Sequence, residues 1–258
     1  MTKLISIITP AFRSASTLEE CLLSVKNQGD FIEHIVIDGG SSDGTIELLK
    51  KYENSYNLKW LSEPDKGITD AMNKGFNLAQ GEIVAWLDAD NYYQPGIISE
   101  VANIFVTNNS DIVYGNINFI DKYGQIKNVY SPPNNISLAV ALQKNSGGIP
   151  AQPGTFFKRD LYQKVKGFDL SYKVAGDVEF WMKVLKTEPK LYYYNKIIGS
   201  YRLEESGASQ SLKGVFKGLK EMLKIYKQYN QPLLGRLLLI KKYLGGYLKT
   251  LARNYYKK

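Results

Sequence analysis

The first half of the chain alternates short apolar runs with amphipathic stretches. The apolar runs are typical of buried strands and fall at residues 4–9, 34–37, 58–61, 83–87 and 112–114. Between them, apolar positions recur at helical spacing over residues 16–27, 44–52, 68–79 and 95–106. This alternation predicts a doubly wound, mostly parallel sheet flanked by helices. In such a sheet a ligand binds beyond the carboxyl ends of the strands.

The alternation weakens after residue 115. A helical pattern returns at residues 177–187, and two further amphipathic helices are expected from residue 212, separated by Asn230-Gln231-Pro232. We therefore expect an α/β domain over residues 1–211, divided near residue 115, and a helical C-terminal appendage over residues 212–258.

Composition narrows the chemistry. The 258 residues suffice for one well-buried α/β domain. The one cysteine, Cys21, excludes an intramolecular disulfide, and the one histidine, His34, disfavours clustered His or Cys zinc sites and a Ser-His-Asp triad. A bound metal should therefore be a hard cation held by carboxylates.

The net charge of +8 is unevenly distributed. Residues 213–258 carry +11, whereas the rest of the chain carries −3. The apolar run at residues 4–8 is too short for a signal sequence, and no window reaches the 18 or so apolar residues of a spanning helix. These features predict a cytoplasmic protein with a near-neutral body and a basic tail.

Two carboxylates one residue apart end the apolar run at residues 83–87. The segment reads Asp88-Ala89-Asp90-Asn91, and paired acids at a buried strand end need a compensating positive charge. A divalent cation that carries a diphosphate would supply it, because Mg²⁺ commonly uses one or two carboxylates plus phosphate oxygens. The alternative is a turn with a helix N-cap, where Asp and Asn are common.

Three further polar stretches follow predicted strands or begin predicted helices. Asp38–Thr45 could offer hydrogen bonds to a nucleotide or form a capped turn, and Glu63–Gly75 places acids beside an apolar helical stripe. Asp177 begins the 177–187 helix, where it would act as an N-cap or as a general base.

These stretches, in this order, resemble the family 2 glycosyltransferases of GT-A fold. The resemblance covers about residues 4–205 and rests on the stretches Thr9–Phe12, Asp38–Thr45, Glu63–Gly75, Asp88–Asp90 and Asp177–Trp181. It implies that residues 1–115 form a nucleotide-binding half and residues 116–211 an acceptor-side half. It also implies an inverting enzyme, and the absence of Gln-x-x-Arg-Trp implies that the enzyme is not processive.

The resemblance assigns a role to each matching residue. Thr9, Pro10 and Phe12 would line the base pocket, Asp38 would hold uracil or ribose, Asp65 and Lys66 would lie near the nucleoside or diphosphate, Asp88 would face ribose or sugar, Asp90 would bind Mg²⁺ or Mn²⁺, and Asp177 would be the catalytic base. Gln152, which follows Ala151 where relatives often carry His, would reach the donor sugar or the acceptor. Arg202, before a candidate loop at residues 204–209, would contact phosphate. For Gln152 and for Arg202, the alternative is a position in a plain loop without ligand contact.

The sequence thus predicts transfer of a sugar from a nucleotide-diphosphate sugar, with UDP favoured by family frequency, to a hydroxyl of a saccharide or lipid-linked saccharide in cell-surface polysaccharide or glycan synthesis. The alternatives are a sugar-phosphate nucleotidyltransferase and a non-catalytic nucleotide-binding or membrane-surface module. Nucleic acid is not expected as a partner, because no nucleic-acid motif accompanies the basic tail.

Two helical faces in the tail are apolar and flanked by lysines. The first comprises residues 215–226 and the second residues 233–252. A basic amphipathic helix of this kind binds an anionic membrane surface, here the inner face of the cell membrane. The alternative is a helix packed on the body or on a second subunit.

Overall fold

The computed structural model describes residues 5–143, 148–203 and 212–232, together with residues 235, 237, 240, 241 and 243. The expected loop at residues 204–209, and most of the second tail helix, lie outside the described residues. None of the helices in the described part of the chain has the length and apolarity that a bilayer crossing requires.

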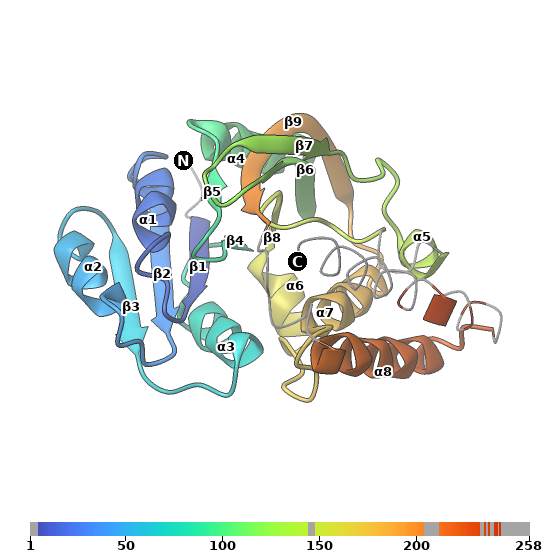
Figure 1. Cartoon of the computed structure of the whole chain (residues 1–258). Coiled ribbons are helices and arrows are strands. Elements are labelled where there is room, and N and C mark those ends of the chain that lie inside the picture. The colour runs from blue at the N-terminus through green and yellow to red at the C-terminus, as the bar shows by residue number, and fades with distance from the viewer. Residues whose placement is uncertain are drawn as a thin grey trace.

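The N-terminal half follows the predicted alternation. Its elements are β1 (Ile5–Ala11), α1 (Leu18–Lys26), β2 (Ile32–Asp38), α2 (Thr45–Tyr52), β3 (Leu58–Ser62), α3 (Ile68–Leu78), β4 (Ile83–Trp86), β5 (Tyr92–Tyr93) and α4 (Ile97–Asn108). Strands β1 to β4 run parallel in the order β3-β2-β1-β4, which brings their carboxyl ends to one edge (Figure 1). Every residue of β1 and of β2 is buried, as expected for parallel strands covered on both faces.

The second half adds strands of both directions. Its elements are β6 (Ile112–Ile120), β7 (Ile126–Tyr130), α5 (Leu138–Gln143), β8 (Thr155–Lys158), α6 (Arg159–Lys164), α7 (Gly176–Leu185), β9 (Leu191–Arg202) and α8 (Leu212–Gln228). Strand β8 pairs antiparallel with β4 and β6, so the described strands form one mixed nine-stranded sheet. The division expected at residue 115 falls inside β6, which runs well beyond the predicted residues 112–114.

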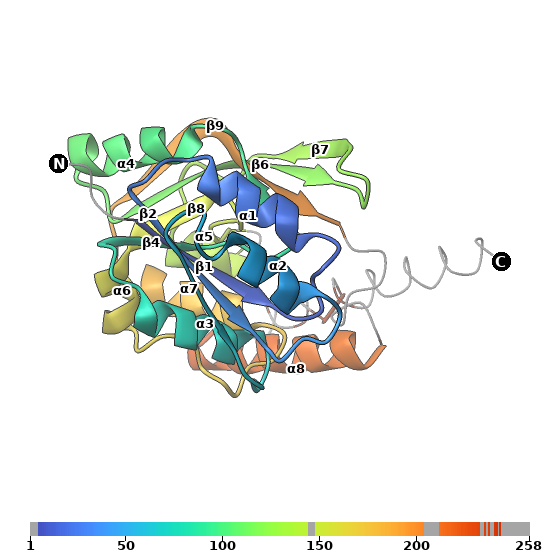
Figure 2. The same cartoon turned by 90° about the vertical axis from the view of Figure 1, so that its left-hand side faces the viewer.

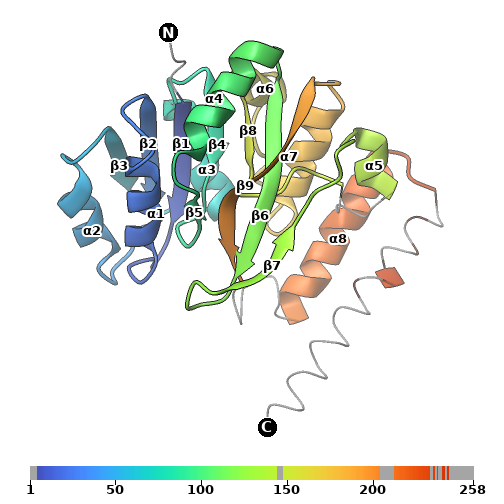
Figure 3. The same ribbon diagram turned by 90° about the horizontal axis from the view of Figure 1, so that it is seen from above.

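Helices cover both faces of the sheet (Figure 3). Side chains from α1 and α4 form one core on one face, and side chains from α3, α6, α7 and α8 form another core on the opposite face. Neighbouring residues of β1 divide between the two: Ile7 belongs to the first core and Ile8 to the second, as the two-residue period of a strand requires.

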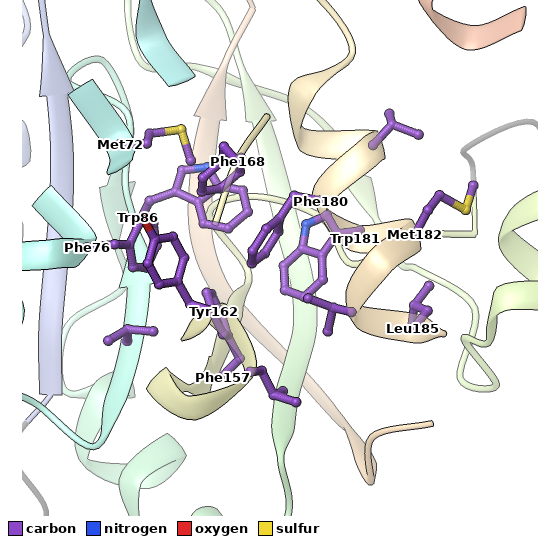
Figure 4. Close-up of a cluster of buried hydrophobic side chains, with 14 of the residues drawn as sticks. Met72, Phe76, Trp86, Phe157, Tyr162, Phe168, Phe180, Trp181, Met182 and Leu185 are labelled. Atoms are coloured by element: carbon purple, nitrogen blue, oxygen red, sulfur yellow. The ribbon is translucent and has the colours of Figure 1, made fainter. Parts of the chain in front are cut away.

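An aromatic cluster fills the core beneath α7 (Figure 4). The rings of Trp86 and Trp181 stack with centroids 5.6 Å apart, and those of Phe168 and Phe180 stack at 4.3 Å. Aromatic pairs of this geometry add stability beyond the area they bury. The cluster therefore fixes the end of β4 against α7, two elements that carry candidate site residues.

Helix α8 packs on the body, which favours the second of the two alternatives for the start of the tail. Met222, Ile225 and Tyr226 are at most 1% exposed and belong to the core that also holds α7. Figures 1 and 2 show α8 along the lower side of the molecule, below α7. Its exposed side chains are mainly lysines, with Phe216 also exposed, so most of the apolar face expected to contact a membrane is instead used within the protein.

Candidate functional site

A cavity of about 740 Å³ opens at the carboxyl edge of the parallel strands. Its walls come from the segments after β1, β3 and β4, from the start of α3, and from the end of β9. The lining includes Pro10, Phe12, Arg13, Asp65, Asp88, Asp90, Lys122, Tyr201 and Arg202. We call this space the first cavity. Its position agrees with the expectation for a doubly wound sheet.

The segment after β1 is held by polar side chains of the Asp38–Thr45 stretch. Ser41 Oγ accepts a hydrogen bond from Arg13 N at 2.7 Å, and Thr45 Oγ1 accepts one from Ser14 N at 2.9 Å. Arg13 has φ of 51°, which is uncommon for a residue with a side chain. These bonds maintain that backbone and place the Arg13 guanidinium 5.3 Å from the ring centroid of Phe12. A cation and an exposed aromatic ring thus line the same wall.

Asp38 is fully buried and holds its own loop. Its carboxylate accepts hydrogen bonds from Gly40 N at 3.0 Å and Ser41 N at 2.9 Å, and from the hydroxyls of Ser41 and Ser62. It lies at the same sheet edge as the acids after β4 but lines neither described cavity. The structure therefore shows Asp38 holding its own loop, and its expected contact with uracil or ribose stays a prediction.

Glycine allows the segments after β1, β2 and β3 to approach closely. A Cβ atom added at Gly39 would lie 2.7 Å from Asp65 Oδ2 and 3.2 Å from Phe12 Cδ2. Asp65 Oδ1 in turn accepts a hydrogen bond from Gly67 N at 2.7 Å. Asp65 and Phe12 are therefore neighbours on the cavity wall because residue 39 has no side chain.

Arg202 anchors the acidic segment after β4. Its backbone N–H donates to Asn91 Oδ1 at 2.8 Å, and its Nε donates to the carbonyl oxygen of Asp90 at 3.0 Å. Its Nη1 donates to the carbonyl oxygens of Asp121 and Lys122, and Nη2 pairs with Glu20. The guanidinium expected to contact phosphate is thus already engaged within the protein, although Arg202 lines the first cavity.

Asp88 and Asp90 are the carboxylates offered to a metal ion. Both line the first cavity from the segment after β4. Within the described residues, no group of three or more His, Cys, Asp or Glu side chains gathers. Two carboxylates nevertheless suit Mg²⁺ or Mn²⁺, which are commonly bound by one or two protein carboxylates and by phosphate oxygens. The residues present therefore fit a metal that arrives with a phosphorylated ligand.

A second cavity, of about 460 Å³, adjoins the first. Asp88, Ile68 and Tyr201 line both spaces, so Asp88 stands at their junction. The second cavity also contains Gln152 and Asp177 in its walls. Most of the residues predicted to bind the nucleotide and the metal thus line the first cavity, and the predicted base lines the second. Asp88 belongs to both.

Polar groups line the second cavity without a protein hydrogen-bond partner. Among the described residues, the side-chain amide of Gln152, the Trp181 Nε1–H and the Thr69 hydroxyl are buried and make no hydrogen bond. Buried polar groups normally have partners, so such groups at a cavity wall indicate a place for a polar ligand. Hydroxyl groups, which both donate and accept, suit this lining.

Asp177 lies at the start of α7 and is an exposed residue that faces the second cavity, although protein atoms surround its carboxyl group. The protein that surrounds it raises the pKa of its carboxyl by desolvation, and the nearby N–H groups of Val178 and Asp177 oppose the rise. A carboxylate with a raised pKa is a stronger proton acceptor than an ordinary aspartate. The site thus suits Asp177 to general-base chemistry.

The structure separates the sequence-predicted residues into three groups. Pro10, Phe12, Asp65, Asp88, Asp90 and Arg202 line the first cavity; Gln152 and Asp177 line the second; Thr9, Asp38 and Lys66 line neither. Thr9 is fully buried, and its hydroxyl is 2.9 Å from His34 Nε2. Lys66 is exposed, and its carbonyl oxygen accepts a hydrogen bond from Lys173 Nζ at 2.6 Å.

Several lining residues were not singled out from the sequence. Arg13 directly follows the Thr9–Phe12 stretch, and that position was the signal that could have identified it. Lys122 and Tyr201 reach the first cavity from the β6–β7 turn and the end of β9. Their positions depend on the pairing of β6 with β9, which no local pattern reveals.

Comparison with known proteins adds independent information. The family model described as "Glycosyl transferase family 2" matches residues 6–166. The chain is 29% identical over 238 residues to an uncharacterized glycosyltransferase of Mycobacterium tuberculosis, a match that covers 90% of this chain and 87% of that one. It is also 29% identical over 220 residues to a PGL/p-HBAD biosynthesis glycosyltransferase of Mycobacterium bovis, over 80% of this chain and 79% of that one.

Solved structures share the fold. TarS residues 1–349 of S. aureus, in complex with UDP-GlcNAc, superpose with a TM-score of 0.71 at 18% identity, over 95% of this chain and 73% of that one. The mannosyltransferase PcManGT of Pyrobaculum calidifontis, in complex with GDP-Man and Mn²⁺, gives 0.65 at 17% identity, over 100% of this chain and 76% of that one. The chain spans 43% of the longer TarS chain.

Proposed function

The chain belongs to glycosyl transferase family 2, and on that premise we propose that it transfers a sugar from a nucleotide-diphosphate sugar to a hydroxyl of a saccharide or lipid-linked saccharide, with inversion. UDP is the favoured nucleotide. The observation that carries the proposal is the pair of adjoining cavities that share Asp88. The first would hold the donor and the second the acceptor.

The first cavity has groups suited to each part of the donor. The exposed ring of Phe12 offers a face to the base, and Asp65 offers a carboxylate to nucleoside hydroxyl groups. Arg13 and Lys122 place positive charge in the wall for a diphosphate. The UDP and GDP-mannose complexes of the structural neighbours support a nucleotide sugar as donor.

Asp90, with Asp88, would hold Mg²⁺ or Mn²⁺. The Mn²⁺ complex of PcManGT supports this proposal. When bound, the cation stabilises negative charge on the departing nucleoside diphosphate. Arg202 contributes indirectly, because its hydrogen bonds to Asp90 O and Asn91 Oδ1 fix the backbone that presents these acids.

Asp177 would serve as the general base. It accepts the proton of the acceptor hydroxyl while the hydroxyl oxygen bonds to the anomeric carbon and the bond from that carbon to the diphosphate oxygen breaks. Attack from the second cavity and departure into the first occur on opposite sides of the carbon, which gives inversion. Gln152, Thr69 and Trp181 would orient the acceptor through its hydroxyl groups.

Incubation with nucleotide sugars, Mn²⁺ and saccharide acceptors tests this proposal. The wild type should release the nucleoside diphosphate and form product without added pyrophosphate, which separates it from a nucleotidyltransferase. Asp177→Asn should retain donor binding but lose about 10²–10⁴-fold in transfer rate. Asp90→Asn should weaken metal-dependent donor binding, which calorimetry with and without chelator measures.

Asp30→Asn is a matched control, because Asp30 is an exposed carboxylate that lines no described cavity. It should behave as wild type. Transfer by Asp177→Asn at the wild-type rate would remove Asp177 as the base. Donor binding that does not depend on metal in wild type and Asp90→Asn alike would remove the metal from the proposal.

We also propose that α8 brings the enzyme to an anionic membrane surface through its lysine face. Lys213, Lys217, Lys220 and Lys227 are exposed on α8, while its apolar face, apart from the exposed Phe216, is packed on the body. Contact would therefore be electrostatic rather than by insertion of the apolar face. A lipid-linked acceptor would then be presented near the second cavity.

A further inference from the structure

Helix α8 carries one acidic side chain that is turned into the protein. Glu221 is the single acid among the twelve basic residues of segment 213–258, and it is 8% exposed. Its Oε1 accepts a hydrogen bond from Lys173 N at 3.0 Å, and its Oε2 accepts bonds from Val174 N and Ala175 N, both at 2.9 Å. One buried carboxylate thus binds three consecutive backbone N–H groups.

These N–H groups immediately precede α7. The helix begins at Gly176, and its N-cap residue, Ala175, makes no side-chain cap hydrogen bond. The N–H of the N-cap residue is one of the N–H groups at a helix start that have no acceptor within the helix. Here Glu221 supplies the acceptor from another helix, 46 residues away along the chain. Charged acceptors also form the stronger hydrogen bonds.

Other contacts of α8 reach the same segment. Lys224 lies over the ring of Tyr172 at 4.2 Å, and its Nζ donates to Ser171 Oγ at 3.2 Å. A Cβ atom at Gly218 would lie 3.1 Å from Val174 Cγ1, so the backbone of α8 is close to that side chain. Residues 218, 221 and 224 recur every three positions and therefore share one face of α8.

The segment held in this way forms part of the second cavity. Lys173 and Val174 line it, and Asp177 follows two residues after Ala175. Lys173 Nζ also donates to the carbonyl oxygen of Lys66, which links the segment to the loop after β3. Burial raises the pKa of Tyr243, and the charges of Asp177 and Glu221 add to the rise, which places both acids near one tyrosine.

We propose that Glu221 is a positioning residue, which holds segment 173–175 so that Asp177 points at the acceptor hydroxyl. This inference rests on the proposed function of Asp177 as the base. It assigns a role in the reaction to a helix that lies beyond residues 6–166, the part matched by the family model. Because α8 lines neither cavity through its described residues, Glu221 should affect the transfer step and leave donor binding unchanged.

The test compares Glu221→Gln and Glu221→Ala with Gln228→Ala, an exposed residue at the end of α8 that lies outside the lysine face. Glutamine keeps one acceptor oxygen, whereas alanine keeps none. A misplacement of about 1 Å can cost roughly 10²-fold in rate, so kcat should fall about 10²-fold in Glu221→Ala and about tenfold in Glu221→Gln. The Kd for UDP with Mn²⁺ should stay within about twofold in all three variants.

Hydrogen exchange supplies a readout that does not depend on turnover. Amides of residues 173–175 should exchange faster in Glu221→Ala than in wild type, with Glu221→Gln between them and Gln228→Ala unchanged. If Glu221→Ala does not melt cooperatively, Glu221→Gln carries the comparison, since it retains one carbonyl oxygen for the same N–H groups.

Three results would overturn the proposal: wild-type kcat in both Glu221 variants, equal losses of UDP affinity and of kcat, or unchanged exchange at residues 173–175. Failure of the proposed function is a separate result. In that case the wild type itself would bind no nucleotide sugar, while the exchange experiment would still show whether Glu221 holds the segment.

Discussion

Asp177 illustrates a conflict between stability and activity at a single residue. Desolvation raises the pKa of its carboxyl above the usual 3.8. Between 3.8 and that raised pKa the folded state binds more protons than the unfolded state, so Asp177 makes the free energy of unfolding fall as the pH rises through this window. Above the window the ionised carboxylate lowers the stability of the fold, although it is the form that accepts a proton.

The first prediction follows from this sign. Asp177→Asn should raise the melting temperature slightly at pH 7 relative to wild type, because Asp177 is exposed and solvent screens the effect; the gain should vanish below pH 3.8, where both states carry a protonated Asp177. Urea unfolding at several pH values measures the difference, with Asp30→Asn as the control. Equal stabilities of Asp177→Asn and wild type at every pH would show that Asp177 is not desolvated in the folded protein.

Transfer should depend on the same titration. Because the base works only when ionised, kcat should fall as the pH drops through the raised pKa of Asp177, with an acid limb above the range of an exposed aspartate.

Gln152 gives a second prediction at the residue scale. Its amide makes no protein hydrogen bond among the described residues, so Gln152→Ala should change the melting temperature little. If the amide binds an acceptor hydroxyl, the KM for the acceptor should rise about five- to tenfold, as expected for one lost hydrogen bond of about 1 kcal/mol. Steady-state kinetics with the exposed Gln80→Ala as control measure this change. An unchanged acceptor KM in Gln152→Ala would show that Gln152 does not bind the acceptor.

The sequence predicted the elements of the N-terminal half better than those of the second half. Strands β1 to β4 are apolar runs buried on both faces, so their pattern is local. Strand β6 was recognised only at Ile112–Tyr114, because polar residues follow. Asn116 in that strand is buried, and its amide is satisfied by Asn195 and by the hydroxyl of Tyr193. Those partners lie almost 80 residues away and leave no local signal.

In the candidate site, too, residues with a local sequence signal were predicted, whereas contacts between distant segments were not. The acids after β4 were identified because a polar pair directly follows an apolar run. The hydrogen bond from Ser62 to Asp38 was not predicted, since Ser62 belongs to the end of β3 and comes close only through sheet register. Arg202 was identified as a site residue, but its hydrogen bonds to Asp90 and to the β6–β7 turn depend on the pairing of β9.

At the scale of elements, the packing of α3 on β1 and β2 depends on Gly75. A Cβ atom there would lie 2.4 Å from Ile8 Cγ2 and 3.3 Å from Ile37 Cγ1. Alanine improves helix propensity by about 1 kcal/mol, but overpacking a rigid core typically costs about 1–3 kcal/mol. Since Ile8 lies in a buried strand with little room to move, the overlap should dominate.

We therefore expect Gly75→Ala to lower the free energy of unfolding, by up to about 2 kcal/mol. Denaturant titration measures it, with Asn77→Ala on the exposed side of α3 as control, expected within about 0.5 kcal/mol of wild type. Because α3 also contributes Ile68 and Ala71 to the first cavity, UDP affinity should fall in Gly75→Ala. A Gly75→Ala protein more stable than wild type would show that α3 is free to move off the sheet.

At the scale of the molecule, α8 joins the catalytic body to a surface of positive charge. Because its apolar face is buried, removal of the tail would expose core side chains, so truncation is a poor test of membrane contact. Charge reversal on the exposed face avoids this problem. Lys217 and Lys220 are suitable, since both side chains are exposed and lie on the described part of α8.

We expect Lys217→Glu/Lys220→Glu to reduce binding to anionic liposomes. Each lysine near such a surface contributes about 1 kcal/mol, so loss of two should lower partitioning roughly thirtyfold. The control, Lys50→Glu/Lys164→Glu, makes the same charge change at exposed lysines of α2 and α6. Flotation at low and high salt measures both. Equal flotation of the two double variants would show that α8 does not make the membrane contact.

The most direct test of the two-cavity account is a crystal structure of Asp177→Asn with an intact UDP-sugar and Mn²⁺. The account predicts the nucleotide beside Phe12 and Arg13, the cation between Asp90 and the diphosphate, and the sugar at Asp88 with its anomeric carbon facing residue 177. A fully occupied donor elsewhere on the molecule, or a sugar turned away from residue 177, would contradict it.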